Sequence, residues 1–179
     1  MIFEKLLNRC WRALRLLWPW FLVTRFTSPV PPGLWLTNVF MQRILRMNGK
    51  VPWMVHFTSC VSGDIEIGET VWKSFALSGG CYIQGGNGVL IGDDTLFAPG
   101  VKIISANHSM TDLHRWDPAP PVRIGKRCWI AANAVILPGV VLGDDVIVGA
   151  GAVVTKSFPD GSILGGVPAK LIPAKQRSE

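Results

Sequence analysis

The sequence lacks several features that would place it in common functional classes. Its four cysteines form neither a CxxC pair nor a dense framework, so we expect reduced, buried thiols at Cys10, Cys60, Cys81 and Cys128. No apolar run is suited to crossing a bilayer, because Leu16–Thr24 is short and residues 26–42 contain three prolines. Arginines interrupt the apolar region that a secretory signal would need. These absences favour a cytoplasmic protein.

Acidic residues are almost missing from the first fifty positions, which hold eight Lys or Arg and one Glu. The rest of the chain holds ten basic and eleven acidic residues, so its charge is nearly balanced. This asymmetry speaks against nucleic acid as a partner of the main domain. It directs attention to anionic membrane surfaces for the N-terminal segment.

The N-terminal segment, residues 1–53, has the composition of an amphipathic α-helical arm. Apolar residues recur at helical spacing between Glu4 and Phe21, with arginines on much of the opposite side. The proline and glycine cluster at residues 29–33 predicts a break, and a second helix is expected from Leu34 to about Met47. Five of the eight tryptophans lie in this segment. Residues 1–48 are therefore expected to bind a membrane surface or to pack on the main domain or on another subunit.

An aliphatic residue recurs every six positions in the second half of the chain. These residues are Ile124, Ile130, Ile136, Leu142, Val148 and Val154. Four places after each lead residue, up to Val148, stands another small or aliphatic residue: Cys128, Ala134, Val140, Val146 and Ala152. A period of six does not fit helical turns, whereas it fits a short strand followed by a tight corner. The pattern predicts a mainly β protein, a hexapeptide parallel β-helix over residues 54–172, rather than a β-sandwich with accidental spacing.

Two irregularities interrupt the repeat. Lys73, Gly79 and Gly85 occupy lead positions in the early coils, which predicts a distorted or opened side there. After Ile104 the period stops, which predicts a loop at residues 105–123 that contains two of the three histidines. Long loops of this kind are often functional. Residues 173–179 read as a C-terminal tail.

Five sequence blocks in this region resemble the hexapeptide-repeat, left-handed β-helix acyltransferases. They are Ala106-Asn-His108, residues 121–130 (PVRIGKRCWI), 134–140 (AVILPGV), 149–156 (GAGAVVTK) and 166–170 (GVPAK). Within that family the chain is similar to galactoside and maltose acetyltransferases and to capsule and exopolysaccharide O-acetyltransferases. The resemblance implies a left-handed coil and a homotrimer with acetyl-CoA lying between adjacent subunits.

The resemblance also implies roles for individual residues. His108 matches the catalytic base, and Ser78, Asn107 and Asp112 are the acceptor-binding candidates. The donor contacts fall on the aromatic Trp129, on Ala132 and Ala150 along the pantetheine arm, and on Thr155, Lys156 and Lys170 near the phosphates. The chain departs from the sugar enzymes at two places: Ser78 and Gly86 stand where those enzymes carry polar acceptor ligands, and Pro173 stands at the last basic donor contact.

Transfer of an acetyl group from a thioester to a hydroxyl needs a base for the hydroxyl proton, and a neutral imidazole suits this task. The expected function is an acetyl-CoA-dependent O-acetyltransferase that acts by direct transfer, without a metal. Its expected acceptor is a sugar hydroxyl of a cell-surface polysaccharide or of its lipid-linked precursor. His108 also needs an orienting partner, for which the candidates are Asp112 and Asp117 in the same loop, and Asp64 and Glu66 of a neighbouring subunit. The alternatives are a zinc enzyme of the carbonic anhydrase kind, which needs three converging histidines, and an inactive glycan-binding or scaffold trimer.

Overall fold

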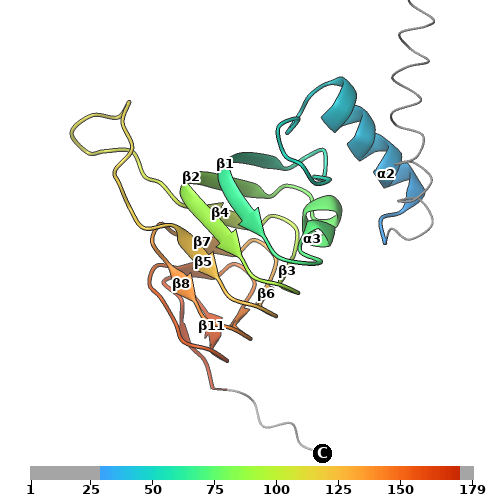
Figure 1. Cartoon of the computed structure of the whole chain (residues 1–179). Helices are drawn as coiled ribbons and strands as arrows, with labels where there is room; N and C mark the ends of the chain where they lie inside the picture. Colours follow the sequence, from blue (N-terminus) through green and yellow to red (C-terminus); the bar gives the residue numbers. More distant parts are fainter. Residues whose placement is uncertain (1–28, 174–179) are drawn as a thin grey trace, which may run out of the picture.

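The structure is a computed structural model that describes residues 29–173. The predicted helix between Glu4 and Phe21, Cys10 and the end of the tail lie outside the described residues. A three-sided parallel β-helix forms most of the described part, with helices at its N-terminal end (Figure 1). The elements are α2 (Pro32–Val39), η1 (Phe40–Ile44), β1 (Cys60–Ile67), α3 (Trp72–Leu77), β2 (Tyr82–Ile91), β3 (Leu96–Phe97), β4 (Lys102–Ile104), β5 (Val122–Ile124), β6 (Trp129–Ile130), β7 (Val135–Ile136), β8 (Val141–Leu142), β9 (Ile147–Val148), β10 (Val153–Val154), β11 (Ile163–Gly165) and β12 (Lys170–Leu171).

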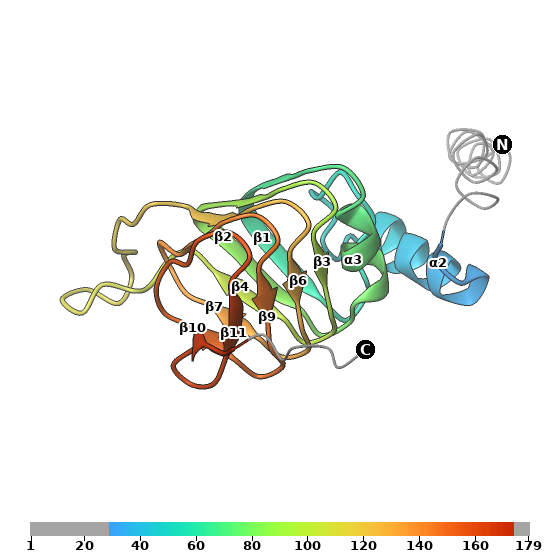
Figure 2. The same cartoon turned by 90° about the horizontal axis from the view of Figure 1, so that it is seen from below.

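Three stacks of short strands make the three faces of the coil (Figure 2). The first face contains the first halves of β1 and β2, then β4, β7 and β10. The second face contains the second halves of β1 and β2, then β5 and β8. The third face contains β3, β6, β9, β11 and β12. The long strand β2 runs without interruption from the first face to the second.

Three corners join these faces, and we name each by its content. The loop corner, between the first and second faces, includes residues 105–121, 137–140 and 155–157. The aspartate corner, between the second and third faces, includes residues 92–95, 125–128 and 143–146. The alanine corner, between the third and first faces, includes residues 98–101, 131–134 and 149–152.

The period-six prediction is confirmed by burial. All six lead aliphatic residues and all five residues that follow them by four places are buried in one continuous core. Neighbouring strands in the later coils pair residues 18 positions apart, as in Val153 with Val135 and Ile147 with Trp129. Three six-residue sides therefore make one coil, and each coil adds one layer to the core.

The predicted loop is present, but it ends at residue 121, two residues earlier than expected. Lys102 pairs with Val135, which is 33 residues away instead of 18, so 15 additional residues leave this coil. Val122 and Arg123 were expected in the loop, but they belong to β5 and pair with β2. Val122 is fully buried in the core, and this burial keeps it in the coil.

Helix α3 occupies the place of a third-face strand in the first coil, which confirms the predicted distortion. Phe75 of α3 packs edge-on against Phe97 of β3, with ring centroids 4.8 Å apart. The hydroxyl of Ser78 donates to the Phe97 carbonyl (2.7 Å), and the Phe97 N–H donates to the hydroxyl of Ser74 (3.1 Å). Two serines one helical turn apart thus replace the ladder bonds that a neighbouring strand would supply to β3.

The second predicted helix starts two residues earlier and ends about three residues earlier than expected. Pro32 and Gly33 were expected in the break, yet they begin α2, because proline is well accommodated in the first turn where its missing N–H is not needed. The π-helical segment η1 follows directly and ends at Ile44. No helix within residues 29–173 is long and apolar enough to cross a membrane.

Two buried amide side chains fasten these helices to the coil. Asn38 is fully buried; it donates to the Ala76 carbonyl (3.0 Å) and accepts from the Phe57 N–H (3.0 Å). Gln42 donates to the Trp53 carbonyl (2.8 Å) and accepts from the Val55 N–H (3.1 Å). Residues 30–53, the second half of the predicted arm, therefore pack on the coil. This agrees with the expectation that the arm packs on the main domain.

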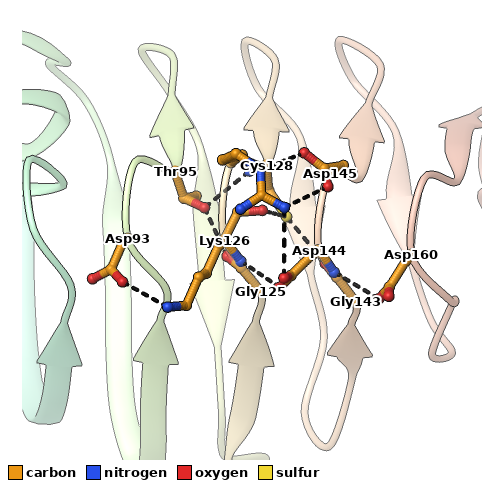
Figure 3. Close-up of polar contacts among 10 residues, drawn as sticks. Asp93, Thr95, Gly125, Lys126, Cys128, Gly143, Asp144, Asp145 and Asp160 are labelled. Atoms are coloured by element: carbon orange, nitrogen blue, oxygen red, sulfur yellow. Dashed lines mark hydrogen bonds and ion pairs between the residues drawn. The ribbon is translucent and has the colours of Figure 1, made fainter.

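The aspartate corner is held by side chains that bond to the backbone of the preceding coil (Figure 3). Asp144 accepts from the Lys126 N–H, and Asp160 accepts from the Asp144 N–H, each at 2.8 Å. Lys126 also lies 2.9 Å from the Asp93 carboxylate. These carboxylates satisfy corner amides that have no strand partner.

Candidate active site

The loop at residues 105–121 folds into a short antiparallel ladder that contains His108. The Ser109 N–H donates to the Arg115 carbonyl and the Asp117 N–H donates to the Asn107 carbonyl, both at 2.9 Å. His108 and Trp116 are thereby placed directly opposite each other. The loop leaves the coil on the side away from α2, as both views show (Figures 1 and 2). His108 is exposed on this projection.

A backbone carbonyl orients the His108 ring. Its Nδ1 lies 2.6 Å from the Leu113 carbonyl oxygen. Because a carbonyl can only accept, Nδ1 carries the hydrogen in this contact, and the unprotonated nitrogen of the neutral ring is Nε2. The ring is thus held with a basic nitrogen available to a hydroxyl group.

Within this chain, the Leu113 carbonyl binds Nδ1 of His108 in place of the expected Asp112 or Asp117. The Asp112 carboxylate instead accepts from the His114 N–H (3.0 Å) and stabilises the turn that carries Leu113. Sequence reasoning missed Leu113 because its contribution is a carbonyl that any residue would supply. Only the register of the ladder reveals it.

The predicted donor-binding residues divide into two groups on the surface of one subunit. Trp129 is 53% exposed on β6, directly before the alanine corner. Ala132 and Ala150 lie in successive turns of that corner, where the Gly151 N–H donates to the Ala132 carbonyl (2.9 Å). Lys170 is exposed and begins β12, directly after residues 166–169, in which the Gly166 carbonyl accepts from the Val153 N–H (3.1 Å) at the end of the same corner.

Thr155 and Lys156 form the second group, at the loop corner. Both are exposed and directly follow β10. The Lys156 ammonium lies 5.6 Å from the centre of the Phe158 ring. Thr155 and Lys156 therefore share an edge of the first face with the His108 loop, while Trp129 and the alanines border its opposite edge.

The acceptor candidates have unequal surroundings. Ser78 is 6% exposed and its hydroxyl is bound to Phe97, so the structure speaks against its predicted contact with an acceptor. Asn107 and Asp112 are exposed in the His108 loop. Asn107 is the neighbour of His108 and supplies a carbonyl to the ladder.

The described cysteines are all free, and two of the three are buried. Burial raises the pKa of the Cys81 and Cys128 thiols, so neither is a reactive thiolate. The expectation of burial is wrong for Cys60, which is exposed at the start of the first coil.

The histidines do not form a metal site in the described range. His56 stacks on Phe57, with ring centroids 4.8 Å apart, and contacts the Thr58 hydroxyl (2.9 Å). Burial lowers the pKa of His56. Within residues 29–173, no three His, Cys, Asp or Glu side chains lie where they could share a metal ion. The zinc-enzyme alternative therefore has no support in this part of the chain.

A coil of 18-residue turns with a histidine-bearing loop defines a hexapeptide-repeat β-helix, and comparisons with known proteins agree. The family model described as bacterial transferase hexapeptide (six repeats) matches residues 121–156. Galactoside O-acetyltransferase of Escherichia coli (strain K12) is 35% identical over 112 residues, which are 61% of this chain and 53% of that protein. The "Putative lipopolysaccharide biosynthesis O-acetyl transferase WbbJ" of the same strain is 40% identical over 98 residues, 47% of this chain and 49% of that protein.

A solved structure shows the same fold. The hexapeptide-repeat acetyltransferase VCA0836 from Vibrio cholerae O1 biovar eltor, complexed with acetyl coenzyme A, superposes with a TM-score of 0.55 at 25% identity. The match covers 65% of this chain and 67% of that one. The resemblance to the hexapeptide-repeat acyltransferases is thus confirmed, and the fold is the left-handed parallel β-helix of that class. The chain spans about half the length of the curated relatives named above.

Proposed function

We propose that this protein is an acetyl-CoA-dependent O-acetyltransferase that acts on a sugar hydroxyl of a cell-surface polysaccharide or of its lipid-linked precursor. The observation that carries the proposal is His108, exposed on the projecting loop with its Nδ1 bound to the Leu113 carbonyl. The two relatives from Escherichia coli support the reaction class, since both are named as O-acetyl transferases.

The proposed reaction is a direct transfer in which His108 moves one proton. Nε2 of His108 accepts the proton of the sugar hydroxyl while that oxygen attacks the carbonyl carbon of the acetyl thioester. The carbon–sulfur bond then breaks, and the imidazolium of His108 returns the proton to the departing thiolate. Acetyl-CoA supplies the activated acetyl group. No cysteine is needed as a carrier, in keeping with the buried thiols of Cys81 and Cys128.

The surface residues fit a CoA donor in chemical type. The exposed indole of Trp129 offers an apolar wall, and Ala132 and Ala150 leave the coil backbone open to a pantetheine arm. Lys156 and Lys170 are exposed cations suited to phosphate groups.

A homotrimer would bring the separated groups together. Within one chain, the His108 loop and the alanine corner border opposite edges of the first face, and β4 alone spans about 10 Å of that face. A head-to-tail contact joins unlike edges of neighbouring subunits, and three such contacts close a ring. Sedimentation in mild detergent should give a trimer, and an active monomer would refute this arrangement.

The base role is tested by replacing His108 with alanine. We expect turnover to fall at least about 10²-fold while acetyl-CoA affinity stays unchanged, because proton transfer is lost and the donor groove remains. His114→Ala is the matched control, since His114 is exposed in the same loop. Near wild-type turnover by His108→Ala would place the base elsewhere. Tight glycan binding by a wild-type protein that transfers nothing would favour the scaffold alternative.

We further propose that the N-terminal region holds the enzyme on an anionic membrane surface. Helix α2 and η1 carry an outward apolar row, in which Leu36, Phe40 and Ile44 are 60%, 51% and 61% exposed. Arg46 and Lys50 are exposed just beyond this row. An apolar row flanked by cations suits a lipid headgroup boundary, and each cation near such a surface contributes about 1 kcal/mol.

A deletion that tests this second proposal has to leave the packing of α2 and η1 on the coil intact. Deleting residues 1–48 would remove Asn38 and Gln42, which fasten α2 and η1 to the coil, so the deletion should stop at residue 28. Full-length protein should bind vesicles of phosphatidylcholine and phosphatidylglycerol more tightly than vesicles of phosphatidylcholine alone. The triple variant Leu36→Gln, Phe40→Gln, Ile44→Gln should lose the part of binding that survives high salt. Met110→Gln is the control, since Met110 is 92% exposed in the distant loop. Equal binding by all forms would indicate that the row packs against another subunit.

A further inference from the structure

Trp116 is a cross-strand neighbour of His108 in the loop ladder. The flanking hydrogen bonds join Ser109 with Arg115 and Asn107 with Asp117, so His108 and Trp116 form the non-hydrogen-bonded pair between them. In such pairs the Cα atoms lie about 4.5 Å apart and the two side chains project from the same face. A group that reaches the imidazole of His108 therefore comes close to the indole of Trp116.

A glycine beneath the indole makes this position possible. A Cβ atom added to Gly86 would lie 2.5 Å from Cζ3 and 2.7 Å from Cε3 of Trp116. The six-membered ring of the indole thus occupies the space that a side chain at position 86 would fill. The resemblance matches position 86 to a polar acceptor ligand of the sugar enzymes, and in this chain the indole of Trp116 takes that space.

The backbone around Trp116 is fixed to the coil. The Asn87 side chain donates to the carbonyls of Asp117 (3.1 Å) and Ser105 (2.9 Å), and the Asn87 N–H donates to the Ser105 hydroxyl (2.9 Å). With its inner edge on Gly86, Trp116 still has 50% of its surface exposed. The loop therefore presents a positioned aromatic surface beside the basic nitrogen.

We propose that Trp116 is an acceptor-binding residue against which the sugar ring packs when its hydroxyl reaches His108. An indole offers a broad apolar face and loses little conformational entropy on binding. The C–H face of a pyranose ring is a suitable partner, and a side chain without charge does not require a charged acceptor. This inference rests on the proposed acetyltransferase function and specifies how that site holds its acceptor.

The test compares Trp116→Ala, Trp116→Phe and Met110→Ala, with acetyl-CoA as donor and p-nitrophenyl β-D-galactopyranoside as acceptor. Release of the CoA thiol gives kcat and KM for each substrate. Trp116→Ala should raise the acceptor KM at least tenfold, which corresponds to about 1.4 kcal/mol. Its kcat and its KM for acetyl-CoA should stay within about threefold of wild type, because His108 and the donor groove are unchanged. Trp116→Phe should keep most of the acceptor affinity, and Met110→Ala should match wild type.

A second variant addresses the placement of the ring. Gly86→Ser should displace the indole and raise the acceptor KM as Trp116→Ala does, and the double variant should be no worse than either single one. An unchanged acceptor KM in Trp116→Ala, or a loss confined to kcat or to the donor KM, would overturn the inference while leaving the acetyltransferase function in place. A wild-type enzyme that transfers acetyl to no glycoside would overturn both.

Discussion

Replacing Gln42 with alanine should lower the free energy of unfolding by about 2–4 kcal/mol. Gln42 is 4% exposed, and its amide bonds to the carbonyls of Val51 (3.1 Å) and Trp53 (2.8 Å) and to the N–H of Val55 (3.1 Å). A buried backbone group left without a partner costs about 1–3 kcal/mol. Water entering the space left by the side chain can satisfy some of these groups, so the expected loss lies below the full sum.

Urea and thermal unfolding of the whole chain measure this effect. For a chain of this size, the loss corresponds to a fall in Tm of roughly 5–15 °C. Ile44→Gln is the matched control two residues further along, because Ile44 is 61% exposed and should change stability by less than about 0.5 kcal/mol. A Gln42→Ala protein as stable as this control would show that the packing of α2 and η1 on the coil does not depend on the buried amide.

Two further predictions concern the aspartate corner. Hydrogen bonds from Lys126 and Arg127 hold the pKa values of Asp93 and Asp145 below their usual range. Both pairs therefore stabilise the fold at pH values above the unfolded-state pKa of about 3.9. This stabilisation is lost as the pH falls through the lowered pKa values of the folded state. Urea titrations at decreasing pH and low salt should show this loss, and it should be absent from the variant Asp93→Asn, Asp145→Asn. Gly143→Ala should destabilise the coil by about 1–3 kcal/mol, because its Cβ would overlap the Asp160 carboxylate and lie 2.5 Å from the Asp160 nitrogen. Gly33→Ala, in helix α2 with no atom within 4 Å, should instead stabilise by about 0.5–1 kcal/mol; equal effects of the two glycine variants in denaturant titrations would contradict this reasoning.

The repeated part of the fold was predictable because burial imposes its own period on the sequence. Every coil needs an inward aliphatic residue at each side, so Ile124 and its successors mark the faces without any information from distant residues. The first coil was not predictable in the same way. The hydroxyl groups of Ser74 and Ser78 form hydrogen bonds with the backbone of Phe97 in β3. Serines used in this way produce no periodic pattern in the sequence.

The candidate site also contains residues that the sequence could predict and residues that it could not. His108 could be found because the residues around it match a family motif. Its orienting partner is a carbonyl, and its neighbour Trp116 is set by the register of a ladder within the loop. Ser78 shows the opposite case, in which spacing suggested an acceptor ligand and packing gave the hydroxyl a structural partner.

The two ends of the coil determine how copies of this protein can associate. A parallel strand stack offers an open backbone edge at each end, and such edges invite further chains to add and form fibres. Here α3 covers β3 at one end of the third face, and at the other end β12 turns back to run antiparallel to β11. A second copy therefore meets neither a long edge nor strands in a matching direction on this face. This arrangement disfavours end-to-end pairing of copies through the third face.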